Sequence, residues 1–239
     1  MTPHWTTSLP DRLGALPFGG DLIRTDPGGP PQAPIAFLGV YPAATRVEKR
    51  LVGDEYMNLS LEVERTSFES GSESGKHLDA HYLEPLGLDR AHVFLFDMMP
   101  YFLANTARSG KGGRSMWDNI QRYQKVTGEK LAVKPRPEPK KLLGECRSMH
   151  GNRERLVDYI GRCRPELLLT LGAEPAAFTR GCVIAKVVGE LLYAAPVEIN
   201  FLDVNVRTVH LVHPGNLMRN KSWRKKHETW CRGAGREMV

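Results

Sequence analysis

The chain has 239 residues, of which 41% are hydrophobic and 25% charged, with a formal net charge of +6 and a pI near 9.2. This composition is typical of a globular protein and excludes a low-complexity or fibrous one. No apolar run approaches the ~20 residues of a membrane-spanning helix. The amino terminus lacks the basic-then-apolar pattern of a secretory signal. We therefore expect a cytoplasmic protein with no membrane partner.

The chain contains four cysteines, and none of them forms a CxxC pair: Cys146, Cys163, Cys182 and Cys231. This spacing argues against a disulfide framework and against a zinc site. We expect no metal and no other cofactor.

In chain order, residues 1–33 are rich in proline and glycine and predict an irregular arm packed on a later core. Apolar runs then predict buried strands at Ile35–Leu38, His92–Phe96, Leu167–Leu171 and Val206–Val212. One helix is predicted between the first two strands, ending near Pro85 and Gly87, with the apolar face Leu78, Tyr82, Leu83 and Leu86. A second helix is predicted with the apolar face Leu156, Val157, Ile160 and Cys163, capped by Asn152.

Strands that alternate with helices predict parallel pairing, so we expect an α/β fold. Its architecture should be a three-layer αβα sandwich around a central, mostly parallel four-stranded sheet. Residues 109–141 interrupt this alternation with a Gly/Lys-rich start and a proline-rich end, which predicts a long surface excursion. Since no internal repeat is present, residues 1–239 are expected to form a single domain and a monomer.

Two of the predicted strands end in turns rich in glycine and proline. The first is followed by Gly39-Val40-Tyr41-Pro42, and the last by His213-Pro214-Gly215-Asn216-Leu217. In α/β proteins, ligands bind where strands end in such turns. The sequence therefore predicts a small binding site with a histidine in it.

The end of the chain is strongly basic. From Leu217 to Val239, two acidic residues face seven basic ones, which are Arg219, Lys221, Arg224, Lys225, Lys226, Arg232 and Arg236. A local field of this sign attracts phosphate backbones, so we expect DNA as a partner. The alternative is a solvated helix face.

Five segments in this order resemble the uracil-DNA glycosylase superfamily, over roughly residues 34–230. They are Gly39–Ala44, Phe68 with Ser74–Asp79, Leu86–Asp97, Arg164–Ala173 and His213–Leu217. The third and fourth are similar to segments of the iron–sulfur-bearing branches. The resemblance implies a DNA repair enzyme that everts a damaged base and hydrolyses its N-glycosidic bond.

The resemblance also implies residue roles. Gly39, Val40 and Pro42 would line the base pocket, Phe68 would stack on the base, and Asp97 would contact its edge. His213 would stabilise the charge that develops as the bond breaks, and Tyr41 lies in the first catalytic motif.

DNA contacts are implied for the second motif and the helix after it. Leu217 or Met218 would wedge into the base stack. Asn216 and Arg219 would hold a phosphate, and Lys221 and Arg224 would follow the backbone.

The chain departs from the family in its first motif, because Val40 and Tyr41 occupy positions where an acid or asparagine usually lies. A tyrosine can donate a hydrogen bond, but with a pKa of ~10 it is a poor base. Carboxylates further along, at Glu48, Asp54 and Glu55, are candidates to position water. The sequence does not assign this role.

Two further departures affect the substrate and the cofactor. Asp97 stands where asparagine is usual, and an ionised aspartate only accepts hydrogen bonds, so we hypothesise either a base other than uracil or a protonated Asp97. The iron–sulfur branches need four cysteines, of which only Cys146 falls at a matching place, so no cluster is expected.

Two alternatives to a glycosylase remain open. The missing acid favours a catalytically silent homologue that binds nucleic acid or a free base. A third possibility is nucleotide or small-molecule chemistry on the same fold, with the basic end binding RNA.

Overall fold

A computed structural model describes residues 27–41, 44–52, 55–63, 72–107, 114–128 and 133–239, with only the backbone given for 44–52 and 55–63. It contains a five-stranded sheet in the order β4-β1-β7-β9-β8. The strands are β1 (Ile35–Gly39), β4 (Val93–Asp97), β7 (Leu167–Leu171), β9 (Val204–Leu211) and β8 (Val197–Phe201). The first four in the sheet order pair in parallel, and β8 pairs antiparallel to β9. The fold is therefore α/β, with a mostly parallel sheet.

The four predicted strands form the parallel part of the sheet. Every residue of β1, β4 and β7 is buried, which explains their continuous apolar runs. The predicted strand count was wrong, because β8 adds a fifth strand at the edge. It joins β9 through Leu202 and Asp203, whose φ angles of 54° and 69° form a tight hairpin turn.

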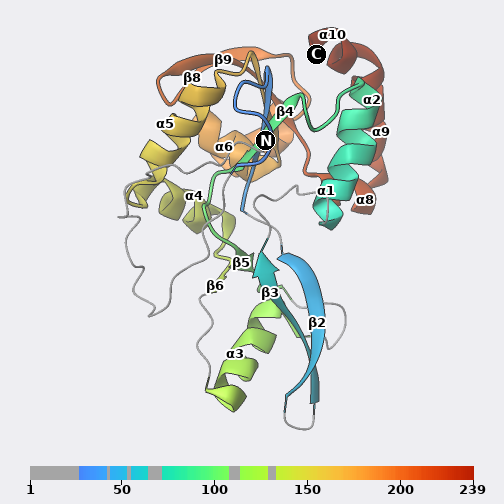
Figure 1. Cartoon of the computed structure of the whole chain (residues 1–239). Helices are drawn as coiled ribbons and strands as arrows, with labels where there is room; N and C mark the ends of the chain where they lie inside the picture. The colour runs from blue at the N-terminus through green and yellow to red at the C-terminus, as the bar shows by residue number, and fades with distance from the viewer. Residues whose placement is uncertain (1–26, 42–43, 53–54, 64–71, 108–113, 129–132) are drawn as a thin grey trace.

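Helices flank the sheet on both sides (Figure 1). One group contains α1 (Glu73–Leu78), η1 (Asp79–Leu83), α2 (Glu84–Leu86), α8 (Pro214–Arg219) and α9 (Lys221–Trp230). The other contains α4 (Pro139–Ser148), α5 (Asn152–Cys163) and α6 (Ala173–Arg180). Shorter helical segments are α7 (Ile184–Lys186), η2 (Val187–Leu191), η3 (Cys231–Gly235) and α10 (Arg236–Met238).

The helix predicted to end near Gly87 runs through α1, η1 and α2, and Gly87 ends it in the left-handed conformation. Its middle turn is a π-helix, in which the Glu84 N–H bonds to the Asp79 carbonyl. The cap predicted for α5 was wrong. Gly151 is the N-cap, and the Asn152 side chain bonds instead to the Met98 and Cys146 carbonyls.

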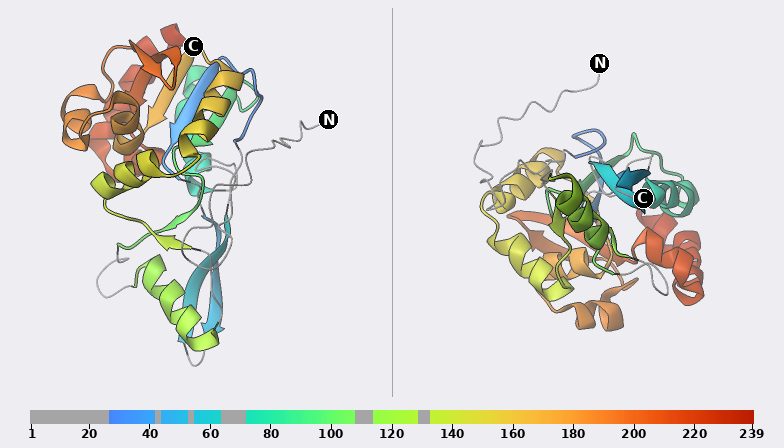
Figure 2. Two further views of the ribbon diagram at one scale, coloured as in Figure 1. Left: turned by 90° about the vertical axis from the view of Figure 1, so that its left-hand side faces the viewer. Right: turned by 90° about the horizontal axis from the view of Figure 1, so that it is seen from below.

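A small lobe lies away from the sheet (Figures 1 and 2). It holds the hairpin β2 (Ala44–Val52) and β3 (Glu55–Val63), the helix α3 (Met116–Thr127), and the parallel pair β5 (Leu103–Ala104) and β6 (Lys134–Pro135). A second cluster of buried residues holds it together: Phe102, Ala104, Ile120 and Tyr123. The predicted excursion therefore contains a capped helix rather than loop alone.

Most of the predicted amino-terminal arm, residues 1–26, lies outside the described residues. Its last part is fixed to β4, because the N–H groups of Gly28 and Leu95 each donate to the other's carbonyl at 2.8 Å. Gly29 has a φ of +85°, and a Cβ there would lie 2.0 Å from the Val93 carbonyl oxygen. Only glycine fits this approach.

None of the helices in the described ranges combines the length and the apolar character that crossing a bilayer requires.

Two further histidines are buried, one on β9 and one on α9. His210 on β9 contacts the Thr170 hydroxyl through Nδ1 at 2.8 Å, and burial together with the charge of Arg180 lowers its pKa to about 4. His227 on α9 also has its pKa lowered to about 4, mainly by burial. Both rings are therefore neutral at pH 7.

These histidines predict acid sensitivity. Each has a folded pKa below its unfolded value, so the unfolded chain binds more protons as the pH falls from 6.5 to 4. We expect the free energy of unfolding to be highest above pH 6.5 and to fall through that window, by about 1.4 kcal/mol per pH unit for each histidine. Urea denaturation of the wild type and of His227→Gln measures this. An unchanged pH slope in the variant would contradict it.

Candidate functional site

The carboxyl ends of the four parallel strands meet at one edge of the sheet. In the sheet, β1 lies between β4 and β7. The chain passes from β1 to β4 on one side of it and then from β4 to β7 on the other side, so the strand order reverses next to β1. Such a reversal is a topological switch point, where α/β sheets bind ligands. In register, Gly39 faces Asp97. The pairing continues beyond the strands, since Met99 N–H donates to the Val40 carbonyl at 2.9 Å. The two strand ends are thus fixed side by side.

His213 lies at this edge, directly after β9, and caps α8. Its Nδ1 accepts a hydrogen bond from the Gly215 N–H at 3.1 Å. Burial lowers its pKa to about 4, and the charges of Arg136 and Arg219 act in the same direction. The ring is therefore neutral at pH 7, and because Nδ1 accepts, its proton lies on Nε2.

Arg136 links the strand ends to each other. Its guanidinium lies 5.5 Å from the centre of the Tyr41 ring and donates to Glu174 Oε1 at 2.6 Å. Its backbone N–H donates to the Ala104 carbonyl at 2.8 Å, next to the β5–β6 pair. The chain returning from the lobe therefore places a positive charge within the site.

Glu174 contributes a carboxylate that is 15% exposed. It lies in the first turn of α6, just after Gly172, whose φ is +117°. A Cβ on Gly172 would lie 3.6 Å from His213 Cβ and 3.8 Å from Glu174 Oε2. Gly172 is thus the shared neighbour of the carboxylate and the imidazole.

Tyr41 is a protonated phenol in this setting. Burial raises its pKa, Arg136 opposes this, and the carboxylates of Glu174 and Asp97 raise it further. Tyr41 can therefore donate a hydrogen bond at neutral pH but cannot serve as a base.

Asp97 is 3% exposed, and a buried arginine fixes the turn that follows it. Arg155 on α5 donates to the Asp97 carbonyl at 2.8 Å and to the Met98 carbonyl at 3.0 Å. It also donates to Asn152 Oδ1, at 3.0 Å through Nε. This clamp holds the end of β4 in place from the neighbouring helix.

The structure therefore brings together most of the residues that were predicted for the base pocket and for catalysis. Gly39, Val40, Tyr41, Asp97 and His213 all lie at this edge of the sheet.

Other predicted residues are not placed. Pro42, Phe68 and Asp54 lie outside the described residues, and Glu48 and Glu55 lie in strands whose side chains are not described.

Four of the predicted DNA-binding residues are exposed and one is buried. Asn216 and Arg219 are exposed on α8, and Lys221 and Arg224 are exposed on α9. The choice of Leu217 as a wedge was wrong for this conformation, because its side chain packs into the core and is 1% exposed. The neighbouring alternative, Met218, is 46% exposed.

Three residues of the site were missed from the sequence. Arg136 lies in the predicted surface excursion, and Glu174 was not among the candidate residues. Arg155 had a detectable signal, because it shares the apolar face of α5 with Tyr159, one turn further along.

Cys146, which matches a cluster ligand of the iron–sulfur branches, is buried and donates to the Met98 carbonyl at 3.2 Å. Burial raises its pKa to about 12. Across the part of the chain that the structure describes, no group of three or more histidine, cysteine, aspartate or glutamate side chains could hold a metal ion.

No family model matches this chain, and no curated protein matches it either. The geometry of the site is therefore the basis for proposing a function.

The clamp on β4 predicts a large loss of stability for Arg155→Ala. The variant removes the side-chain donor to the Asp97 carbonyl and one of three donors to the Met98 carbonyl, which keeps Asn152 and Cys146. We expect a loss of about 3–5 kcal/mol. Arg153→Ala is the control, because that arginine pairs at the surface with Asp203 and should contribute less than about 1 kcal/mol. Urea midpoints measure both. Equal shifts in the two variants would contradict the clamp.

The position of Arg136 predicts the titration of its neighbours. Arg136→Ala removes a positive charge that lowers the pKa of both His213 and Tyr41, so both values should rise. If water entered the site in the variant, the pKa of Tyr41 would fall instead. The direction in which the Tyr41 pKa moves therefore distinguishes loss of the Arg136 charge from entry of water. NMR titration of the His213 ring measures the first pKa, and ultraviolet titration of tyrosine measures the second. A His213 pKa that stays near 4 would exclude the contact.

Proposed function

We propose that this protein is a DNA-binding base-excision glycosylase that hydrolyses the N-glycosidic bond of a damaged or deaminated base. On this proposal it is a divergent member of the uracil-DNA glycosylase superfamily, with a three-layer αβα architecture. The supporting observation is that Tyr41, Asp97 and His213 come from three separate strand ends at one edge of the sheet. Arg136 lies beside Tyr41 and acts on His213, and the charge of Asp97 acts on Tyr41.

The state of His213 suits this reaction. Breaking an N-glycosidic bond leaves negative charge on the departing base and positive charge on the sugar. A neutral imidazole with its proton on Nε2 can donate to a base carbonyl as that charge develops. Arg136 adds positive charge close to His213.

Glu174 is our candidate for the role that the first motif leaves unfilled. Its carboxylate is little exposed, is held by Arg136 at 2.6 Å and neighbours His213 across Gly172. An ionised carboxylate there can orient a water molecule and stabilise positive charge on the sugar. Tyr41, being protonated, would act only as a donor.

Asp97 would determine which base is accepted. It is buried at the end of β4, beside the backbone of Gly39. An ionised aspartate repels a carbonyl such as O4 of uracil and attracts an exocyclic amine or a ring N–H. The substrate is thus proposed to be a base with a donor at that edge, rather than uracil.

Strand-cleavage assays test the proposal, on oligonucleotides that carry uracil, hypoxanthine, xanthine or a mismatched thymine. We expect cleavage at one of the non-uracil bases. His213→Ala and Glu174→Gln should each reduce the rate by about 10²–10³-fold, as the loss of a preorganised charge-stabilising group does elsewhere. Asp97→Asn should shift the preference towards uracil.

Arg153→Ala is the control, because its surface pair with Asp203 lies on α5 and on the turn after β8. Equal cleavage rates in the His213 and Glu174 variants and in this control would refute the assigned roles. Salt-dependent binding without any product would point instead to the catalytically silent homologue.

A further inference from the structure

A cavity of about 310 Å³ lies between the helix of residues 73–86 and α9, away from the strand ends. This volume falls at the lower end of the ~300–1,000 Å³ typical of small-molecule sites. Its apolar wall is formed by Pro85, Leu217, Met218 and Cys231. Its polar residues come mostly from α9.

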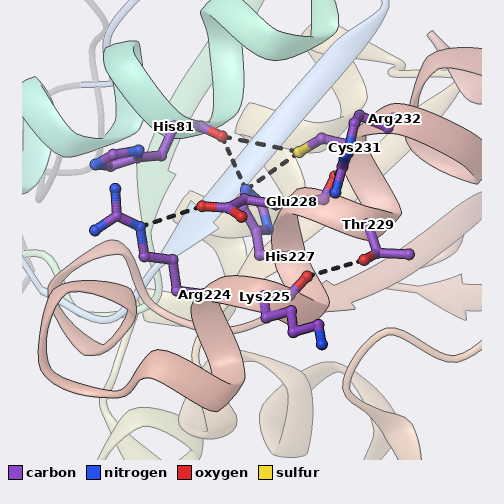
Figure 3. Close-up of polar contacts among 8 residues, drawn as sticks. All are labelled: His81, Arg224, Lys225, His227, Glu228, Thr229, Cys231 and Arg232. Carbon is purple, nitrogen blue, oxygen red and sulfur yellow. Dashed lines mark hydrogen bonds and ion pairs between the residues drawn. The ribbon is translucent and has the colours of Figure 1, made fainter.

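A proline determines how this cavity is built. Pro85 has no N–H, so the carbonyl of His81, four residues earlier, lacks its normal helical donor. His227 of α9 donates to it instead, through Nε2 at 2.9 Å, and its Nδ1 contacts the Tyr193 hydroxyl at 3.0 Å. Figure 3 shows His227 and Cys231 both directed at this carbonyl. The two helices are thus joined along one side of the cavity.

Two guanidinium groups and one carboxylate line the cavity. Arg224 donates through Nε to Glu228 Oε1 at 3.2 Å, and Arg232 donates through Nε to the Glu228 carbonyl at 3.2 Å. Within the described part of the chain, the structure gives the terminal amino groups of neither arginine a hydrogen bond. These groups are the fork with which arginine binds phosphate.

Flat ring surfaces lie beside this charge. The imidazole of His81 stacks on His77 with ring centres 5.8 Å apart and planes at 26°. Burial lowers the pKa of His81, as do the charges of Arg224 and His77. A neutral ring and the thioether of Met218, which is 46% exposed, favour contact with a flat apolar ring.

We propose that this cavity is a second binding site, which takes a nucleoside monophosphate unit. The heterocycle would lie against Pro85 and Met218, and the phosphate would contact Arg224 and Arg232. The unit is either a free nucleotide or the terminal nucleotide of a DNA strand, because both present the same heterocycle and phosphate to the cavity. This site does not depend on glycosylase activity at the strand ends.

Calorimetric titration of the full chain tests the proposal with AMP, adenosine and inorganic phosphate as probes. We expect AMP to bind, and adenosine and phosphate each to bind at least about tenfold more weakly, since each offers only part of the contacts. A deoxyadenosine trinucleotide with a 5′-phosphate, compared with AMP, distinguishes the two sources. Tighter binding of the trinucleotide indicates a strand end, and tighter binding of AMP indicates a free nucleotide.

Variants on α9 and η3 test the location. Arg224→Ala and Arg232→Ala, made separately, should each weaken the binding of whichever nucleotide probe binds by at least about tenfold. Lys225→Ala is the matched control, because it removes the same charge from the same exposed helix outside the cavity lining. All three side chains are at the surface, so each variant should fold. An equal loss in Lys225→Ala, phosphate binding as tight as that of AMP, or no binding of either nucleotide probe would overturn the proposal.

Glu174→Gln separates this site from the proposed active site, because Glu174 lies on α6 and is not part of the cavity lining. The variant should lose base excision while it retains nucleotide binding at the cavity. Loss of nucleotide binding in Glu174→Gln would show that the nucleotide binds at the strand ends, and would also overturn the second site.

Discussion

The guanidinium of Arg136 is the interaction on which the site depends. It contacts the Tyr41 ring, bonds to Glu174, and lowers the pKa of His213. Without this positive charge, a carboxylate and a phenol would share a buried region with little to balance the negative charge. Arg136 is also held by its backbone to Ala104, so the small lobe and the strand ends are positioned by the same residue. The lobe is therefore part of how the site is built.

The parallel strands could be predicted from the sequence because their environment is uniform. β1, β4 and β7 are buried on both faces, so each is a short unbroken apolar run. β8 is an edge strand with three of its five residues exposed, and its turn uses Leu202 at positive φ where glycine or asparagine would be a clear marker. The β2–β3 hairpin did carry such a marker, since Gly53-Asp54 lies between two runs of strand-forming residues.

The site could be predicted only where its residues follow strands directly. Tyr41, Asp97 and His213 are adjacent to β1, β4 and β9, so parallel pairing alone brings them to one edge. Arg136 and Glu174 are 38 residues apart and meet because the lobe folds back on the sheet, which no local pattern encodes.

Helix α8 connects the two regions. His213 caps its first turn at the strand ends, while Leu217 and Met218, within the same six-residue helix, line the cavity beside α9. Tyr82 of the helix of residues 73–86 donates to the Val212 carbonyl, immediately before His213. A ligand that moves the helix of residues 73–86 or α8 would therefore act on the residue before His213 through a buried hydrogen bond. Because Leu217 is packed in the core and Met218 is 46% exposed, Met218 is the residue of this pair that the proposed function would bring into contact with DNA.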